Sequence, residues 1–165
     1  MPVFQPIEAI VPDRESWIWQ RVDLDRLPDD VSLVLTESRY SKNLGATLSC
    51  YGIHASGVQI GEMELSHVEE YPQAALSPAN VHLDKNIGQG YGLSSYLLSI
   101  QEAQRTDCVF TTGYPTSEKA KKIWDILVYV GIAEVVLPFE QLRDQHKTTK
   151  IPMYEGLMRV PVLHA

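Results

Sequence analysis

The chain has 165 residues, 44% of them hydrophobic, and a formal net charge of −7. This length predicts one domain over residues 1–165, in which residues 1–30 form an N-terminal segment without a clear pattern. The negative charge argues against binding to nucleic acid or an anionic membrane, and no apolar run approaches the ~20 residues that span a bilayer. The two cysteines have no metal or redox spacing and no signal peptide is evident, so we expect a cytoplasmic protein.

The first half of the chain predicts a short helix followed by antiparallel strands. Asp13 is expected to cap a helix through Trp17, and a turn at 28–30 follows it. Three β-like runs then cover 31–36, 46–53 and 58–65. A hairpin turn at 54–57 joins the last two runs, and the alternation of apolar residues slips at Gly61, which indicates a bulge.

The second half predicts helices that alternate with strands. Residues 66–78 are polar and are expected to form a loop. The further strands are expected at 79–84, 107–112, 132–137 and 156–162, and the helices at 93–106 and 117–130. Gly131 is expected to end the second helix. Together these elements predict a mixed α/β (α+β) fold with a mostly antiparallel central sheet flanked by helices.

The segment 86–98 is the most informative part of the sequence. Gly88, Gly90 and Gly92 alternate between a short apolar strand and a helical pattern. Such a loop can turn backbone N–H groups toward one point at a helix N-terminus, where the helix dipole favours an anion. A Cβ at these positions would block a close approach or the required backbone angles. The segment therefore predicts a site for phosphate or pyrophosphate.

Two common nucleotide loops do not fit this segment. A P-loop ends in Lys-Ser or Lys-Thr, and no lysine stands there. A dinucleotide fingerprint requires a third glycine where this chain has Leu93, and it belongs to a parallel βαβ unit. The alternative to a phosphate site is a tight turn that uses glycine only for its geometry.

The segment 86–98 resembles the acyl-coenzyme A loop of the GNAT superfamily of N-acetyltransferases. The pattern of that loop is Arg/Gln-x-x-Gly-x-Gly/Ala between the fourth strand and a long helix, and Gly90 and Gly92 match its glycines. The segment 117–131 resembles the second helix of the family. The resemblance covers roughly residues 45–163, and it implies a central sheet that splays at the cofactor strand.

Three features differ from the family pattern. Ile87 occupies the position of the Arg or Gln, so a side-chain contact to the pyrophosphate is missing unless Asn86 or Gln89 replaces it. Trp124 stands where the second helix often has a Tyr that protonates the departing thiolate. Residues 37–45 are too few for the helical pair that normally lies between the first two strands and lines the acceptor side.

The resemblance implies acetyl-coenzyme A as the cofactor. Its pantetheine amides are expected to pair with the strand at Val81 and Leu83, with the backbone N–H near Leu83 as the oxyanion donor. Its pyrophosphate is expected on the backbone of the loop formed by Gly88, Gln89, Gly90, Tyr91, Gly92 and Leu93. The substitution Gly90→Val is then expected to abolish binding while the fold stays largely intact.

The catalytic candidates follow from what acyl transfer to an amine requires. His82 and Glu64 are alternatives for the general base, with Glu62 on the neighbouring strand and a water relay as a further alternative. Tyr129, or Tyr114 in the preceding loop, is the candidate acid for the thiolate. For each of these side chains the alternative is an ordinary surface or packing role.

Cys108 and the histidines are interpreted as structural. Cys108 lies in an apolar run and no activating base is identifiable from the sequence, so we expect a buried core thiol. The five histidines lack a ligand spacing such as His-x-x-x-His, so no metal site is expected.

The sequence thus predicts an acetyl-CoA-dependent N-acetyltransferase that acts on a primary amine. The substrate would be a small cationic amine or a protein lysine or N-terminus, and a homodimer is one assembly that the chain could form. The alternative is a catalytically degenerate GNAT-like domain that serves as a binding or regulatory module.

Overall fold

The computed structural model describes residues 9–42, 46–68, 74–85, 88–112, 118–135 and 158–161. The strands are β1 (Ala9–Ile10), β2 (Val31–Ser41), β3 (Ala46–Ala55), β4 (Val58–Val68), β5 (Ala75–Leu83), β6 (Val109–Thr111), β7 (Glu134–Val135) and β8 (Met158–Val160). The helices are α1 (Trp17–Gln20), the 3-10 turn η2 (Leu24–Arg26), α2 (Tyr91–Arg105) and α3 (Glu118–Tyr129).

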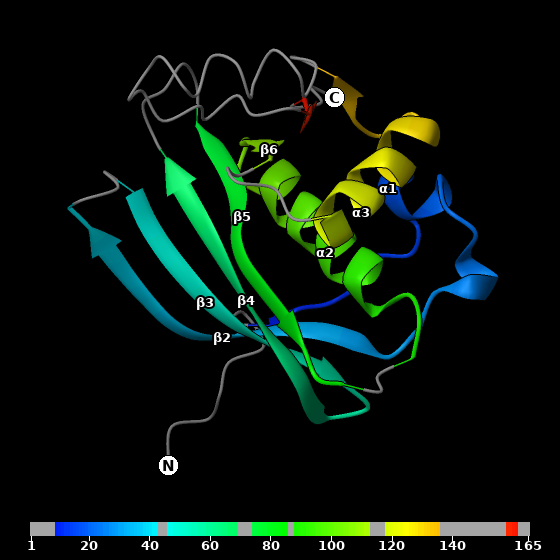
Figure 1. Ribbon diagram of the computed structural model, residues 1–165, viewed down its shortest axis with the longest axis horizontal. Coiled ribbons are helices and arrows are strands. Elements are labelled where there is room, and N and C mark those ends of the chain that lie inside the picture. Colours follow the sequence, from blue (N-terminus) through cyan, green and yellow to red (C-terminus); the bar gives the residue numbers. More distant parts are fainter. Residues whose placement is uncertain are drawn as a thin grey trace.

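The described strands form one sheet in the order β1-β2-β3-β4-β5-β6-β8-β7. Neighbouring strands are antiparallel, except that β5 and β6 are parallel. The helices α1, α2 and α3 lie together on one side of this curved sheet (Figure 1). The predicted mixed α+β class with a mostly antiparallel sheet is therefore confirmed for the described residues.

The N-terminal segment is more ordered than the sequence suggested, and its predicted cap is wrong. Helix α1 has only four residues, and its N-cap is Ser16. Asp13 instead forms the preceding turn, because its carbonyl oxygen accepts hydrogen bonds from the N–H and the Oγ of Ser16 (3.0 and 2.7 Å). Gln101 of α2 holds this segment in place: its Oε1 accepts from Asp13 N (2.8 Å) and its Nε2 donates to the carbonyl of Val11 (2.7 Å).

The predicted hairpin between β3 and β4 is confirmed. Its two turn residues, Ser56 and Gly57, both have positive φ (51° and 80°), and Ala55 pairs with Val58 across the turn. Such turns match the right-handed twist of the flanking strands. The predicted bulge lies at Ile60, one residue before the expected position.

The prediction of a loop over 66–78 is wrong at both of its ends. Strand β4 continues to Val68 and β5 already begins at Ala75, so Pro78 is part of a strand. Proline removes one ladder hydrogen bond and is tolerated in strands mainly at edges and bulges. Ala79, next to Pro78, has no partner on β4 where the register shifts between Glu64 and Leu65, and this bulge in β5 explains how the strand accommodates the proline.

The core lies between the helices and the sheet. Phe110 stacks on Trp124 with ring centroids 5.3 Å apart, and Tyr96 meets both rings edge-on at 6.0 Å. All three rings are buried. Helix α3 ends as predicted, because Gly131 adopts a φ of +80° and the N–H of Ile132 then returns to the carbonyl of Leu127 (2.9 Å).

Candidate functional site

At the C-terminal end of β5, some backbone N–H and C=O groups point away from the neighbouring strand β4. The N–H of Asp84 donates to the carbonyl of Ile60 (2.8 Å), and Leu83 lies opposite Gly61. In an antiparallel ladder this arrangement makes Leu83 a non-hydrogen-bonded position, and Val81, two residues earlier, is another. The N–H and C=O groups of both residues therefore point away from β4.

On that far edge, β5 and β6 pair only at the start of β5. Ala75 pairs with Val109 and Leu76 with Phe110, and β6 ends at Thr111. Within the described part of the chain, residues 77–83 consequently have a strand partner on the β4 side alone. Among the described residues, the pairing of β5 with β6 is thus confined to two residue pairs at the start of β5.

The glycine segment leads from this edge into the N-terminus of α2. The N–H of Ser94 donates to the carbonyl of Gly90 (2.9 Å), which is the first hydrogen bond of the helix. The N–H groups of Tyr91, Gly92 and Leu93 precede that bond, so the helix provides no acceptor for them. The backbone of residues 88–93, which the sequence analysis proposed for the pyrophosphate, therefore lies at one helix end.

The three glycines of this segment are not equivalent. A Cβ on Gly88 would meet only the Tyr91 ring, at 3.8 Å. A Cβ on Gly90 would lie 2.9 Å from Pro28 Cδ, and Gly90 has a φ of +96°. A Cβ on Gly92 would lie 3.3 Å from Ile123 Cδ1. Gly90→Val would therefore be strained at the backbone and against Pro28, so the expectation that it leaves the fold largely intact has to include a cost in stability.

The structure pairs His82 with Glu62 and not with Glu64. His82 and Glu62 are directly opposite on β5 and β4, and both are exposed. They lie on the sheet face opposite to Val81, which packs against the core under the helices. Glu64 is half-buried and lies opposite Asn80 and Cys50.

The position that often carries a tyrosine in the family is part of the core here. Trp124 is 1% exposed and stacks on Phe110. Tyr129, the candidate acid, is 91% exposed at the last residue of α3. Burial raises the pKa of Tyr96 to about 12, so this core phenol stays protonated. Among the described candidates, no side chain is therefore positioned to protonate a departing thiolate.

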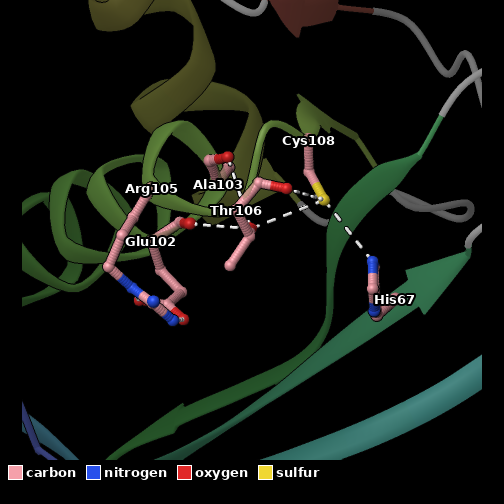
Figure 2. A network of polar contacts seen from close by, with 6 residues as sticks. All are labelled: His67, Glu102, Ala103, Arg105, Thr106 and Cys108. Atoms are coloured by element: carbon pink, nitrogen blue, oxygen red, sulfur yellow. Dashed lines mark hydrogen bonds and ion pairs between the residues drawn. The ribbon is translucent and has the colours of Figure 1, made fainter. Parts of the chain in front are cut away.

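A thiol and an imidazole that the sequence did not connect lie together at the other end of β5 (Figure 2). Cys108 Sγ is 3.4 Å from His67 Nε2, and the hydroxyl of Thr106 donates to the same sulfur at 3.5 Å. Leu76 of β5 pairs with His67 on one side and with Phe110 on the other, and these pairings bring His67 and Cys108 together. No local sequence pattern reveals such a contact between residues 41 positions apart.

The backbone before Cys108 fixes where this thiol points. The N–H of Cys108 returns to the carbonyl of Ala103 (2.8 Å) and the N–H of Asp107 to that of Gln104 (3.3 Å), which is a Schellman ending of α2 with Asp107 at a φ of 55°. Cys108 is 1% exposed, so the prediction of a buried core thiol is confirmed. His67 is a possible base that the sequence did not reveal, but a substrate has no access to the thiol beside it.

The candidate residues Asn86 and Tyr114 lie outside the described residues, as does Ile87 at the Arg or Gln position of the family pattern. Within the described ranges, no group of three or more His, Cys, Asp or Glu side chains is arranged to hold a metal ion. The helices of the described part are too short or too polar to cross a membrane.

Comparisons with known proteins place the chain in no family. No protein-family model, no curated protein and no solved structure matches it. The function therefore has to be argued from the geometry of the chain itself.

Proposed function

We propose that this chain is an N-acetyltransferase of GNAT type, which binds acetyl-coenzyme A and acetylates a primary amine. The observation that carries the proposal is the edge of β5 at Val81 and Leu83, which lacks a strand partner in the described structure and leads into the N-terminus of α2. An extended amide chain that ends in a pyrophosphate is complementary to a strand edge followed by a helix N-terminus.

The described residues fit this ligand class. The outward N–H and C=O groups of Val81 and Leu83 need partners, and an extended pantetheine supplies amides at a spacing that can pair with a strand. The exposed surface around Gly88 leaves room for a phosphate near the N–H groups of Tyr91 and Gly92. Backbone donors at a helix N-terminus are a common phosphate site because the helix dipole adds to their hydrogen bonds.

The residues of this chain would assist the reaction from the outer face of the sheet. The bound thioester supplies the activated acyl group. His82 is exposed and could accept the proton of the amine, and Glu62 opposite it could orient the imidazole. Glu64 remains an alternative base, and a water relay is a further alternative. The N–H of Leu83 would act as the oxyanion donor.

A second candidate is a binding module that keeps the cofactor site without catalysis. The buried position of Trp124 and the outward position of Tyr129 favour it, because neither places an acid for the thiolate. A GNAT-like domain of this kind would bind acyl-coenzyme A without transferring the acyl group.

Thermal unfolding with acetyl-, succinyl- and free coenzyme A tests the cofactor. A ligand at 100 times its dissociation constant stabilises the native state by about 2.7 kcal/mol, so Tm is expected to rise. No rise with any of the three would refute the cofactor assignment. Release of free thiol from acetyl-coenzyme A in the presence of a panel of amines then separates the candidates: release supports the enzyme, and a Tm rise without release supports the binding module.

A further inference from the structure

We propose that the second half of β2 pairs with the same strand of a second copy of this chain, so that two sheets join into one across a twofold axis at Ser38. The inference does not depend on the proposed function. It assigns a partner to a strand edge that neither the core nor the candidate site uses.

The edge of β2 is open over the second half of the strand. β3 pairs with β2 from Val31 to Ser41, whereas on the other side β1 pairs only with Leu33 and Val34. Residues 36–40 are all exposed, and they lie at the outer margin of the curved sheet (Figure 1). Alternate residues of a strand direct their N–H and C=O groups to opposite sides. Among the described residues, this half of β2 therefore offers unpaired groups to a further strand.

Two opposite charges stand on this open edge, Glu37 and Arg39. They are two residues apart in one strand, so they share one face of the sheet. Across the ladder Glu37 pairs with Cys50 and Arg39 with Leu48, so neither lies opposite a charge of β3. Neither is in an ion pair among the described residues. A lysine alone on an edge strand repels a second copy, whereas an acid and a base side by side do not.

The register of the pairing follows from symmetry. A twofold axis perpendicular to the sheet keeps its two faces separate, so residues of one face lie opposite each other and one residue lies opposite its own copy. An axis at Glu37 or Arg39 places like charges opposite each other, and an axis at either end of the exposed stretch places no opposite charge across from them. An axis at Ser38 places Glu37 opposite Arg39 of the second copy, twice. Opposite charges directly across an antiparallel pair stabilise it.

The same axis aligns the exposed stretch 36–40 with itself, because Ser38 is its central residue. Tyr40, which is 66% exposed, then lies opposite Thr36 of the second copy. Pairs of an aromatic and a β-branched side chain also stabilise antiparallel strands. Such a short ladder buries less area than a standard interface, so we expect a reversible dimer whose population rises with protein concentration.

Sedimentation equilibrium on the full chain tests the dimer. Glu37→Arg and Arg39→Glu each place two pairs of like charges across the axis and are expected to raise the dimer Kd by about tenfold or more. The double variant exchanges the two charges, restores both opposite pairs and is expected to return the Kd toward the wild-type value. Glu15→Arg is the matched control, since it makes the same change in net charge at an exposed glutamate elsewhere and is expected to leave the Kd unchanged.

Cysteine cross-linking tests the register, in a chain with Cys50→Ser. Residues directly opposite each other have Cβ atoms about 4.5–5.5 Å apart, so Ser38→Cys is expected to give a disulfide-linked dimer under mild oxidation. Tyr40→Cys is the control, because the two copies of this position would lie four residues apart along the ladder, about 13 Å. Cross-linking of the Tyr40→Cys chain in place of the Ser38→Cys chain would refute the register.

Three further results would overturn the proposal. The first is a wild-type chain that stays monomeric at every concentration, and the second is a double variant that dimerises as weakly as the single ones. Residues 1–8, which precede β1, lie outside the described residues. A chain that dimerises only after their deletion would show that its own N-terminal segment occupies the edge, which is the third. Thermal unfolding of each variant shows whether the fold is kept.

Discussion

The two ends of β5 differ in what their backbone and side chains contact. At its start β5 pairs with β4 and β6, and the adjoining Phe110 and Cys108 are buried at 0% and 1% exposure. At its end β5 pairs with β4 alone in the described structure, and His82 and Gly88 are exposed. One strand thus serves as a core element at one end and as an accessible edge at the other.

This contrast shows where chemistry can occur in the molecule. The closed end holds the arrangement that looks most like a catalytic pair, Cys108 and His67, yet the thiol is inaccessible. The open end has no such pair but has backbone donors and acceptors within reach of a ligand. Accessibility therefore decides which end is the candidate site.

The largest effect is expected at the closed end, from Phe110→Ala. Phe110 contacts the rings of both Tyr96 and Trp124, and truncation of such a buried ring should lower the free energy of unfolding by about 3–5 kcal/mol. Urea denaturation measures the loss. Ile126→Ala is the control, since Ile126 is 42% exposed and should cost far less. A loss below about 1 kcal/mol for Phe110→Ala would contradict the packing of this end.

A smaller loss is expected at the open end, from Gly61→Ala. A Cβ on Gly61 would lie 2.2 Å from the carbonyl oxygen of His82, so β4 and β5 would have to move apart and lose about 1–3 kcal/mol. The same substitution at Gly52 meets only the side-chain ends of Gln59 and His54, both at 3.1 Å, and should be tolerated better. Urea denaturation and coenzyme A binding are measured for both variants. Equal losses of stability would show that the close approach of His82 to Gly61 does not cause the destabilisation.

Next come the glycines before α2. Gly90→Ala should destabilise the fold by at least about 1–2 kcal/mol, because its φ of +96° is unfavourable for any residue with a Cβ and Pro28 is in the way. Gly88→Ala should change stability by less than about 1 kcal/mol but reduce coenzyme A affinity, since its Cβ would enter the open space at the loop. Calorimetry that finds unchanged affinity in Gly88→Ala would indicate that this glycine serves the turn alone.

The sequence predicted what local pattern determines. The turn at Ser56 and Gly57, the end of α3 at Gly131 and the apolar stripe of α2 all depend on residues a few positions apart, and all are confirmed. Residues 75–78 were missed because Pro78 and the polar residues that precede Ala75 have the composition of a loop. A bulge at Ala79 of the same strand, which composition does not indicate, makes that proline acceptable.

The backbone residues of the candidate site were proposed from the sequence, whereas the neighbours of its side chains were not. The resemblance implied Val81 and Leu83, and the register directs their polar groups to the unpaired edge. That Glu62 and not Glu64 lies opposite His82 depends on the register of β4 and β5, which includes one shift that no local pattern fixes. The contact of η2 with Gly90 is a tertiary contact and was not predictable either.

The smallest effect is expected on the alkylation of the two cysteines, Cys50 on the outer face of the sheet and Cys108 at the closed end of β5. Burial, followed by the charges of Glu64 and Glu37, raises the pKa of the Cys50 thiol on the outer face. Only the thiolate reacts with iodoacetamide, so Glu64→Gln should lower this pKa and speed alkylation of Cys50 at pH 8.

Mass spectrometry of the same sample follows Cys108 as an internal reference. It should stay unmodified in the folded chain and react in urea, because its exclusion from solvent does not depend on Glu64. Alkylation of Cys108 in the native protein at a rate comparable to that of Cys50 would mean that the start of β5 opens readily. The closed end would then have to be reconsidered as a reactive site, with His67 as its base.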